Sequence, residues 1–293
     1  LNLRNRLPGL PALGERVLGL SARRSLPTWR RDAFAKHAPA PARLASAQRE
    51  VVLFVDTFNN YFEPENARAA RAVLEAAGYQ VHLPPPPDGR PLCCGRTFLG
   101  AGLIDEARWE LQRMLESLRP YLDRGLPVIG LEPSCLFTLR DELSVLLPSA
   151  ETRGLAASAQ LFEEFLASES ESGRLKLSLK PSPWPQALLH GHCHQKAFGV
   201  MDASAQTLRL VPQLEVKTVE SGCCGMAGAF GYEAEHYEIS VKMAELNLLP
   251  AVRGAGEDTV IVADGTSCRH QIGDGTHREA LHVARVLEAA LAR

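Results

Sequence analysis

Several features that are common in proteins of this size are missing from the sequence. Among its 293 residues, apolar runs such as 51–55 fall far short of the ~20 residues that cross a bilayer. The first residues lack the apolar core and the small-residue cleavage site of a signal peptide. No G-x-G-x-x-G follows a strand, and no acid–base pair for abstracting a substrate proton stands out. We therefore expect a cytoplasmic protein without a membrane span, a dinucleotide site or catalytic residues of its own.

The seven cysteines also lack the usual short motifs. They contain no C-x-x-C hook, which structural zinc sites use, and no C-x-x-C-x-x-C run of the bacterial ferredoxin type. Four of them form two adjacent pairs, Cys93–Cys94 and Cys223–Cys224. One interpretation is that they are buried apolar side chains, as free cysteine often is. Because each pair is followed by glycine, and because spaced cysteines in a cytosolic protein indicate metal or redox work, we favour ligands.

The spacing of the cysteines indicates an internal repeat. Cys93 and Cys223 are 130 positions apart, and Cys135 and Cys268 are 133 apart. Hydrophobic periodicity gives both halves the same alternation of strands and helices. The predicted strands are 51–56, 79–84, 127–132, 186–191, 214–220 and 259–264, and the main predicted helices are 64–77, 97–124, 197–211, 227–249 and 277–292.

This alternation predicts the α/β class, with two similar tandem units that have parallel sheets and arose by duplication. We expect a basic N-terminal connecting arm over 1–50, a first unit over 51–150, a connector over 151–185 and a second unit over 186–293. Every cysteine follows a predicted strand. The carboxyl edge of such a sheet is where ligands lie, because the N–H groups of the following helices point there.

The second half supplies thiols from three loops, which suits a metal centre. Cys193, Cys223, Cys224 and Cys268 are the candidate ligands. Soft sulfur donors in that number favour an iron–sulfur cluster, with zinc as the alternative.

Five motifs together carry a family resemblance: LCCG, GLEPSC, HGHCHQKA, GCCGMAGAFGYE and DGTSCRHQI. They resemble the duplicated cysteine-rich (CCG) domain of glycolate oxidase iron–sulfur subunits and of FAD-linked D-2-hydroxyacid dehydrogenases, which is related to the cysteine-rich subunit of heterodisulfide reductase. The resemblance covers 51–293. It implies an iron–sulfur cluster, [4Fe-4S] in type, held by the cysteines of the motifs.

The chain departs from the family motif of a leading cysteine, a CC pair and C-x-x-C. In the second half Gly265 stands where the first cysteine of C-x-x-C would be. In the first half Cys93, Cys94 and Cys135 match, but Glu132 replaces a cysteine and DTFNNYF supplies no leading one. We expect one cluster on the second half, with the first-half cysteines either supplementing it or holding zinc or no metal.

Several polar side chains adjoin these cysteines. His190, His192 and His194 alternate around Cys193, and a mixed His/Cys zinc site is one interpretation. We favour His192, His194, His270 and Glu132 as neighbours that surround the cluster without binding it. Lys196 and Arg269 also lie beside ligands and are either surface charges or cations that favour cluster reduction.

The segment 1–43 carries nine Arg and Lys against two acids. It has no interleaved aromatic residues and no recognition motif, so we expect no nucleic-acid binding. An acidic protein surface, on a partner or on a preceding domain, is the expected contact. The chain begins with Leu, which we interpret as a sign of a fragment or a processed product.

These inferences lead to one main hypothesis of function. The chain is expected to be the iron–sulfur part of a FAD-linked D-2-hydroxyacid dehydrogenase, passing electrons to a further acceptor. The resemblance implies two partners, a flavoprotein that carries the FAD and a ferredoxin-like 4Fe-4S domain, with peripheral association at the inner face of the membrane left open. The alternatives are a cluster-dependent thiol–disulfide reductase and a zinc-stabilised scaffold.

Overall fold

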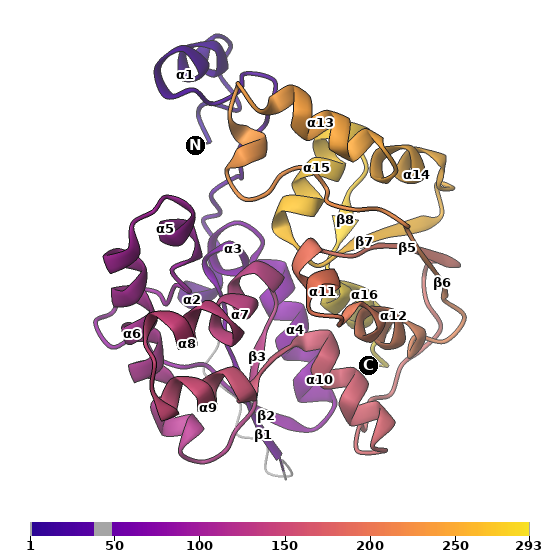
Figure 1. Cartoon of the computed structure of the whole chain (residues 1–293). Helices are drawn as coiled ribbons and strands as arrows, with labels where there is room; N and C mark the ends of the chain where they lie inside the picture. The colour runs from indigo at the N-terminus through magenta and orange to yellow at the C-terminus, as the bar shows by residue number, and fades with distance from the viewer. Residues whose placement is uncertain (1, 38–48, 293) are drawn as a thin grey trace.

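The structure is a computed structural model that describes residues 2–37 and 49–292. Two four-stranded sheets form its centre, with strand orders β2-β1-β3-β4 and β6-β5-β7-β8. All paired strands are parallel. The carboxyl ends of the strands in each sheet therefore lie at one edge. This arrangement confirms the α/β class and the two similar tandem units expected from the sequence (Figure 1).

The two halves repeat one order of elements. The first half contains β1 (Arg49–Leu53), α3 (Thr57–Tyr61), α4 (Pro64–Ala76), β2 (Tyr79–His82), α5 (Arg96–Gly100), α6 (Ile104–Leu122), β3 (Val128–Gly130), α7 (Pro133–Arg140), α8 (Glu142–Leu146), α9 (Ala150–Ser158), β4 (Ala159–Leu161) and α10 (Phe162–Glu171). The second contains β5 (Gln186–His190), α11 (Cys193–Ala197), α12 (Met201–Arg209), β6 (Glu215–Thr218), the 3-10 helix η1 (Phe230–Tyr232), α13 (Tyr237–Glu245), α14 (Leu248–Gly254), β7 (Thr259–Ala263), α15 (Thr266–Thr276), β8 (Ala280–Leu281) and α16 (Val283–Ala289).

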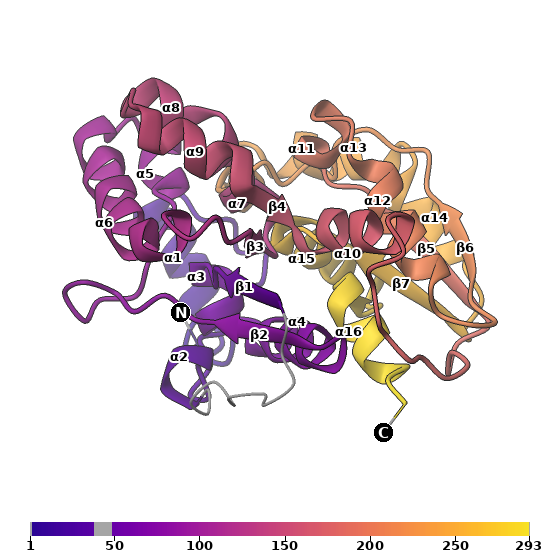
Figure 2. The ribbon, with the colours of Figure 1, turned by 90° about the horizontal axis from the view of Figure 1, so that it is seen from below.

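The halves share one apolar core. Helix α4 of the first half packs against α16 of the second, and α10 packs against α12. Figure 2 shows α4 beside α16 in the middle of the molecule. One cluster of buried side chains, which includes Val51, Leu166, Leu189 and Leu287, runs through both halves. Each half adds a cluster of its own that contains the buried cysteines of that half. The two thiol sites are therefore carried by one continuous body.

All six predicted strands are present, and two more complete the sheets. The additional strands, β4 and β8, have three and two residues, which is too short to give a periodic signal. β4 lies within 151–185, the range assigned to a connector, together with most of α9 and the whole of α10. This range therefore contributes the fourth strand of the first sheet.

Three predicted helices are interrupted. The helix expected over 97–124 is divided into α5 and α6 around Gly102, whose φ is +74°. The one expected over 227–249 does not begin at its first residues, because Ala227 and Gly228 have φ values of +41° and +68°. It forms α13 and the start of α14 instead. In the last, 277–292, His277 is left-handed with a φ of +57°, so α15 ends before it and α16 begins after β8.

The N-terminal arm is more ordered than its sequence indicated. It contains α1 (Leu10–Leu18) and α2 (Phe34–His37), and its Pro/Ala-rich end, 38–48, lies outside the described residues. Arg4, Arg23, Arg24 and Arg30 bond to groups of this same chain. Of these four arginines Arg24 is buried within the chain, and the expected contact of the arm with an acidic partner stays a prediction. None of the described helices is both long and apolar enough to cross a membrane.

Candidate metal centre

The second half gathers four cysteines at the carboxyl edge of its sheet. Cys193 is the first residue of α11 after β5, Cys223 and Cys224 lie in the loop after β6, and Cys268 is the third residue of α15 after β7. Cys224 and Cys268 are 5% and 1% exposed, Cys223 is half-buried and Cys193 is exposed. The site is therefore closed on the protein side and open on the solvent side.

The loop that carries the cysteine pair is held by backbone geometry and by a lysine. Gly225 has a φ of +88°, and its N–H donates to the sulfur of Cys223 at 3.3 Å. Lys196 Nζ donates to the carbonyl oxygens of Ser221 and Gly222, the latter at 3.0 Å. The glycine thus has the conformational role that the sequence predicts. Lys196 holds the loop to α11 and is no free surface charge.

Hydrogen bonds among the four thiols lower the pKa values of two of them and raise those of the other two. Hydrogen bonding with Cys193 and Cys224 lowers the pKa of Cys223 to about 2. Hydrogen bonding with Cys224 likewise holds the pKa of Cys268 well below its ordinary value. The pKa values of Cys193 and Cys224 are raised by the same contacts. The site therefore already contains thiolate character, and a bound metal would displace the remaining protons.

His190 points a buried nitrogen at this site. Its Nδ1 pairs with Ser221 Oγ at 2.8 Å, while its buried Nε2 makes no hydrogen bond of standard geometry within the described residues, although the imidazole contacts the Cys268 thiol and lowers its pKa. The ligand atoms of His190, Cys224 and Cys268 lie within 4.8 Å of one another. A buried polar atom without a hydrogen bond of good geometry is costly. A metal or a cluster sulfur would provide this nitrogen with one, so the residues present fit such a group.

The other histidines expected around the site take several roles. His192 caps α11 by accepting from the His194 N–H at 3.1 Å, and its Nδ1 lies 3.9 Å from the Cys193 sulfur. His194 stacks on His192 and faces Arg96 at 3.4 Å, and burial lowers its pKa to about 4. His270 instead pairs with the hydroxyl of Tyr232 at 3.2 Å.

The first half forms a corresponding site with three cysteines. Cys93 and Cys94 follow β2, and Cys135 is the third residue of α7 after β3. The Gly95 N–H donates to Cys93 at 3.4 Å, as the Gly225 N–H does to Cys223. Thr57, the first residue of α3, takes the position that Cys193 has in α11, and its hydroxyl bonds to Cys93.

The electrostatic character of this site is different. Hydrogen bonding with Cys94, together with burial, raises the pKa of Cys93. Hydrogen bonding with Cys135 raises that of Cys94. The Cys94 contact lowers the pKa of Cys135, but burial and the Asp56 carboxyl outweigh it and raise that pKa to about 12. All three thiols therefore keep their protons at neutral pH.

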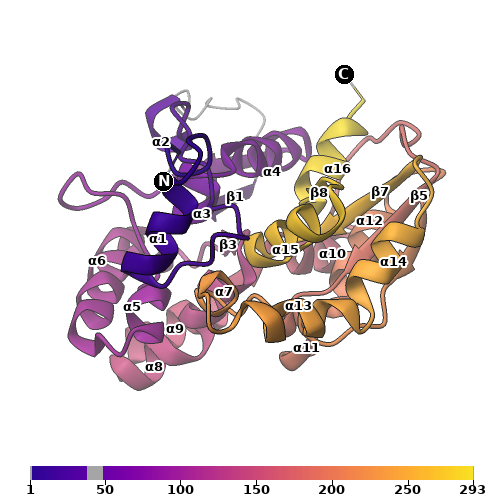
Figure 3. The same cartoon turned by 90° about the horizontal axis from the view of Figure 1, so that it is seen from above.

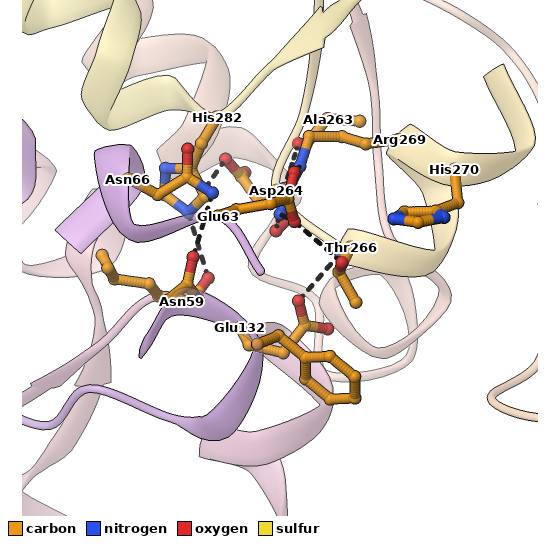
Figure 4. A network of polar contacts seen from close by, with 12 residues as sticks. Asn59, Glu63, Asn66, Glu132, Ala263, Asp264, Thr266, Arg269, His270 and His282 are labelled. Atoms are coloured by element: carbon orange, nitrogen blue, oxygen red, sulfur yellow. Dashed lines mark hydrogen bonds and ion pairs between the residues drawn. The ribbon is translucent and has the colours of Figure 1, made fainter. Parts of the chain in front are cut away.

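Glu132, which occupies a ligand position of the family motif, bonds across to the other half. Its Oε2 accepts from the Thr266 N–H at 2.8 Å, at the start of α15, and its Oε1 accepts from Ser134 Oγ at 2.9 Å. Figure 4 shows this carboxylate facing Thr266. It is fully buried, and burial followed by the nearby Asp56 raises its pKa to about 8.

Arg269 forms a second connection of this kind between the halves. Its guanidinium pairs with Glu63 of the first half, with Nε to Oε1 at 2.7 Å, and it donates to the carbonyl oxygens of Ala263 and Asp264 (Figure 4). Thr266 Oγ1 also donates to Glu63 at 2.8 Å. The expected cation beside Cys268 therefore fixes the start of α15, which carries that cysteine.

Sequence reasoning missed the partners of these connections. Glu63 precedes Pro64 like an ordinary helix start, and its pairing with Arg269 spans 206 residues. Asp264 and Glu163 are buried and share the side-chain amide of Gln195, at 2.9 and 2.6 Å. The only local signal was an acid directly after a buried strand, at Asp264.

Fold and site together define a duplicated cysteine-rich α/β protein with a thiol-lined site on each half. A family model described as the cysteine-rich domain, CCG, matches residues 187–273. One subunit of the anaerobic glycerol-3-phosphate dehydrogenase of Escherichia coli K12 is 30% identical over 294 residues, which cover 100% of this chain and 72% of that protein. The chain therefore belongs to the cysteine-rich family of dehydrogenase subunits, as the sequence motifs indicated.

Two further relatives extend the family. The D-2-hydroxyglutarate dehydrogenase of Pseudomonas putida is 30% identical over 85% of this chain, which corresponds to only 23% of that enzyme. Lactate utilization protein A of Bacillus subtilis 168 is 24% identical over 82% of this chain and 99% of its own length. The same unit thus occurs as part of a large enzyme and as a separate protein, and an oxidoreductase class is confirmed.

Proposed function

We propose that the chain is an iron–sulfur electron-transfer unit that accepts electrons from a flavoprotein dehydrogenase and passes them to a further carrier. The observation that carries the proposal is the second-half site, with Cys193, Cys223, Cys224 and Cys268 on three loops and the buried His190 imidazole beside Cys224 and Cys268. A four-iron cluster held there would accept and release single electrons.

The relatives indicate the kind of substrate that the flavoprotein would oxidise. Glycerol 3-phosphate, 2-hydroxyglutarate and lactate, which appear in their names, each contain a secondary alcohol beside an anionic group. Oxidising such an alcohol to a ketone releases two electrons and two protons. A flavin takes up the electron pair and can release single electrons, which is what a cluster requires. We therefore place FAD on the partner, with a ferredoxin-like 4Fe-4S domain as the other neighbour.

We also propose a cytoplasmic location for this complex, with the inner face of the membrane as its site of action. None of the seven cysteines forms a disulfide, and exposed Cys193 would need a reducing compartment to stay a thiol until a cluster binds. If the protein were exported, oxidised Cys193 would be found in material isolated from cells without reductant.

The test is anaerobic reconstitution of the purified chain with iron and sulfide. The expected result is about four iron and four sulfide per chain, with visible absorption that dithionite bleaches. A sample given iron without sulfide is the control. One tightly bound zinc per chain and no sulfide would contradict electron transfer and support the zinc scaffold.

A further inference from the structure

Arg24 of the N-terminal arm is buried beside the second-half site. Its side chain is 2% exposed. Nε donates to the carbonyl oxygen of Gly231 at 3.0 Å, and Nη2 donates to Ser240 Oγ at 2.9 Å. Nη1 lies 3.6 Å from the Asp274 carboxylate on α15. Figure 3 shows the indigo arm reaching the middle of the molecule beside α15. One arginine thus joins the arm, α13 and α15.

The two residues that Arg24 bonds, Gly231 and Ser240, pack against the residues that follow the cysteine pair. A Cβ at Gly225 would lie 2.2 Å from the carbonyl oxygen of Ser240, so this turn packs directly on α13. Gly231 donates its N–H to Met226 O at 2.8 Å, and a Cβ there would meet Ser240 Oγ at 2.8 Å. Gly225 and Met226 follow the cysteine pair directly. Gly231 and Ser240 therefore connect Arg24 to the pair.

A comparison with the first half shows why the turn after the second cysteine pair needs a side chain such as Arg24 to hold it. There the glycine after the pair, Gly95, packs on Ala107 within the 19-residue helix α6, which begins four residues after α5 ends. In the second half only the three-residue η1 lies between the pair and α13. A long helix holds its own position by its hydrogen bonds and packing, whereas an irregular segment depends on side chains from elsewhere.

We propose that Arg24 is a positioning residue for the metal centre of the second half. Its guanidinium fixes Gly231 and Ser240, these fix the turn at Gly225, and the turn presents Cys223 and Cys224. The arm therefore serves the site of its own chain. The inference rests on the proposed function in one respect: its main measurement is how well the protein retains an iron–sulfur cluster.

The experiment compares two adjacent arginines. Arg24→Gln and Arg24→Lys are the test variants, and Arg23→Gln is the matched control, because Arg23 is exposed, pairs with Glu238 and stacks on the same Tyr237 ring. After anaerobic reconstitution, iron release to a chelator is timed in each. We expect Arg24→Gln to lose iron about tenfold faster than wild type, as for other residues that support ligands. The rate of iron release from Arg24→Lys should lie between those of Arg24→Gln and wild type, because an ammonium group cannot reproduce the several N–H donors of a guanidinium. Arg23→Gln should match wild type.

Equal iron release in Arg24→Gln and Arg23→Gln would overturn the inference. If Arg24→Gln does not fold, as judged by far-UV circular dichroism, Ser240→Ala removes the contact of Nη2 with α13 from the other side. Iron release from Ser240→Ala at the wild-type rate would then overturn it.

A failure of the proposed function is distinguishable from a failure of this inference. If wild type binds no cluster, the function is wrong, and the turn is tested by alkylation of Cys223 in the metal-free protein. Alkylation should be several-fold faster in Arg24→Gln than in Arg23→Gln, since a loosened turn exposes the thiolate. Equal rates would overturn the inference.

Discussion

The two halves place their cysteines on the same scaffold but surround them with different titratable groups. Around the second site lie His190, His192 and Lys196, whereas Asp56 and Glu132 adjoin the first. The pKa values of two thiols in the second site are lowered, and those of all three in the first are raised. Metal–thiolate centres require deprotonated sulfur and carry negative charge. Equivalent cysteines of the two halves therefore differ in thiolate character because their surroundings differ.

The largest expected difference between the halves is in the cluster content after one cysteine of each half is replaced. Cys268 and Cys135 are each the third residue of the helix that follows the third strand of their half. We expect Cys268→Ser to remove almost all iron and sulfide, and Cys193→Ser to do the same. Cys135→Ser should keep most of both. The measurement is iron and acid-labile sulfide per chain after reconstitution. Normal cluster content in both Cys193→Ser and Cys268→Ser would mean that the second half is not the principal site.

The next effect concerns the histidine that only the second half has. His190 ends β5, while the strand β1 ends in the apolar Leu53. His190→Leu removes the buried nitrogen near Cys224 and Cys268, and we expect cluster retention to fall by about 10–100-fold. The rate of iron release to a chelator measures it. His82→Leu, a change of a partly exposed histidine paired with Glu50, is the control. Equal rates of iron release in His190→Leu and His82→Leu would mean that His190 does not help to retain the cluster.

A smaller effect compares the two glycines behind the cysteine pairs. Gly225 and Gly95 have φ values of +88° and +76°, which cost an alanine about 1–2 kcal/mol at either position. At Gly225 the new Cβ would lie 2.2 Å from Ser240 O, but at Gly95 it would lie 3.0 Å from Ala107 O. We expect Gly225→Ala to lower the free energy of unfolding of the metal-free protein by at least about 1 kcal/mol more than Gly95→Ala does, as overpacking does. Urea denaturation measures both, and equal losses would refute the tighter packing of the second turn.

The last effect is a pH dependence of stability at Glu132. Its pKa in the folded protein is about 8 against an ordinary 4.5, so between these values the folded state holds a proton that the unfolded chain has released. Stability must therefore fall as pH rises through this window, by at most about 1.4 kcal/mol per pH unit. Glu132→Gln should remove this slope while leaving most of the cluster absorption. Urea denaturation of both proteins at pH 5 to 8 is the measurement, and parallel curves would contradict the protonated Glu132.

The sequence by itself determined the repeat, six of the eight strands, the class of the fold and the family. These follow from local patterns: alternating strands and helices, and cysteines at the carboxyl ends of strands. It also identified all seven thiols that line the two sites. Strands β4 and β8 escaped because two or three residues give no period, and the helix at 227–249 was overestimated because two left-handed residues interrupt it.

Only the tertiary structure decided how the surroundings of the two thiol sites differ and which distant side chains hold each site in place. Arg24 meets Gly231 207 residues away, Arg269 meets Glu63 206 away, and Glu132 meets Thr266 134 away. No periodicity or motif links residues so distant, because such pairs form only after the two halves have packed. The pKa values of the thiols likewise depend on burial and on neighbouring charges, which the packing of the two sheets and their helices creates.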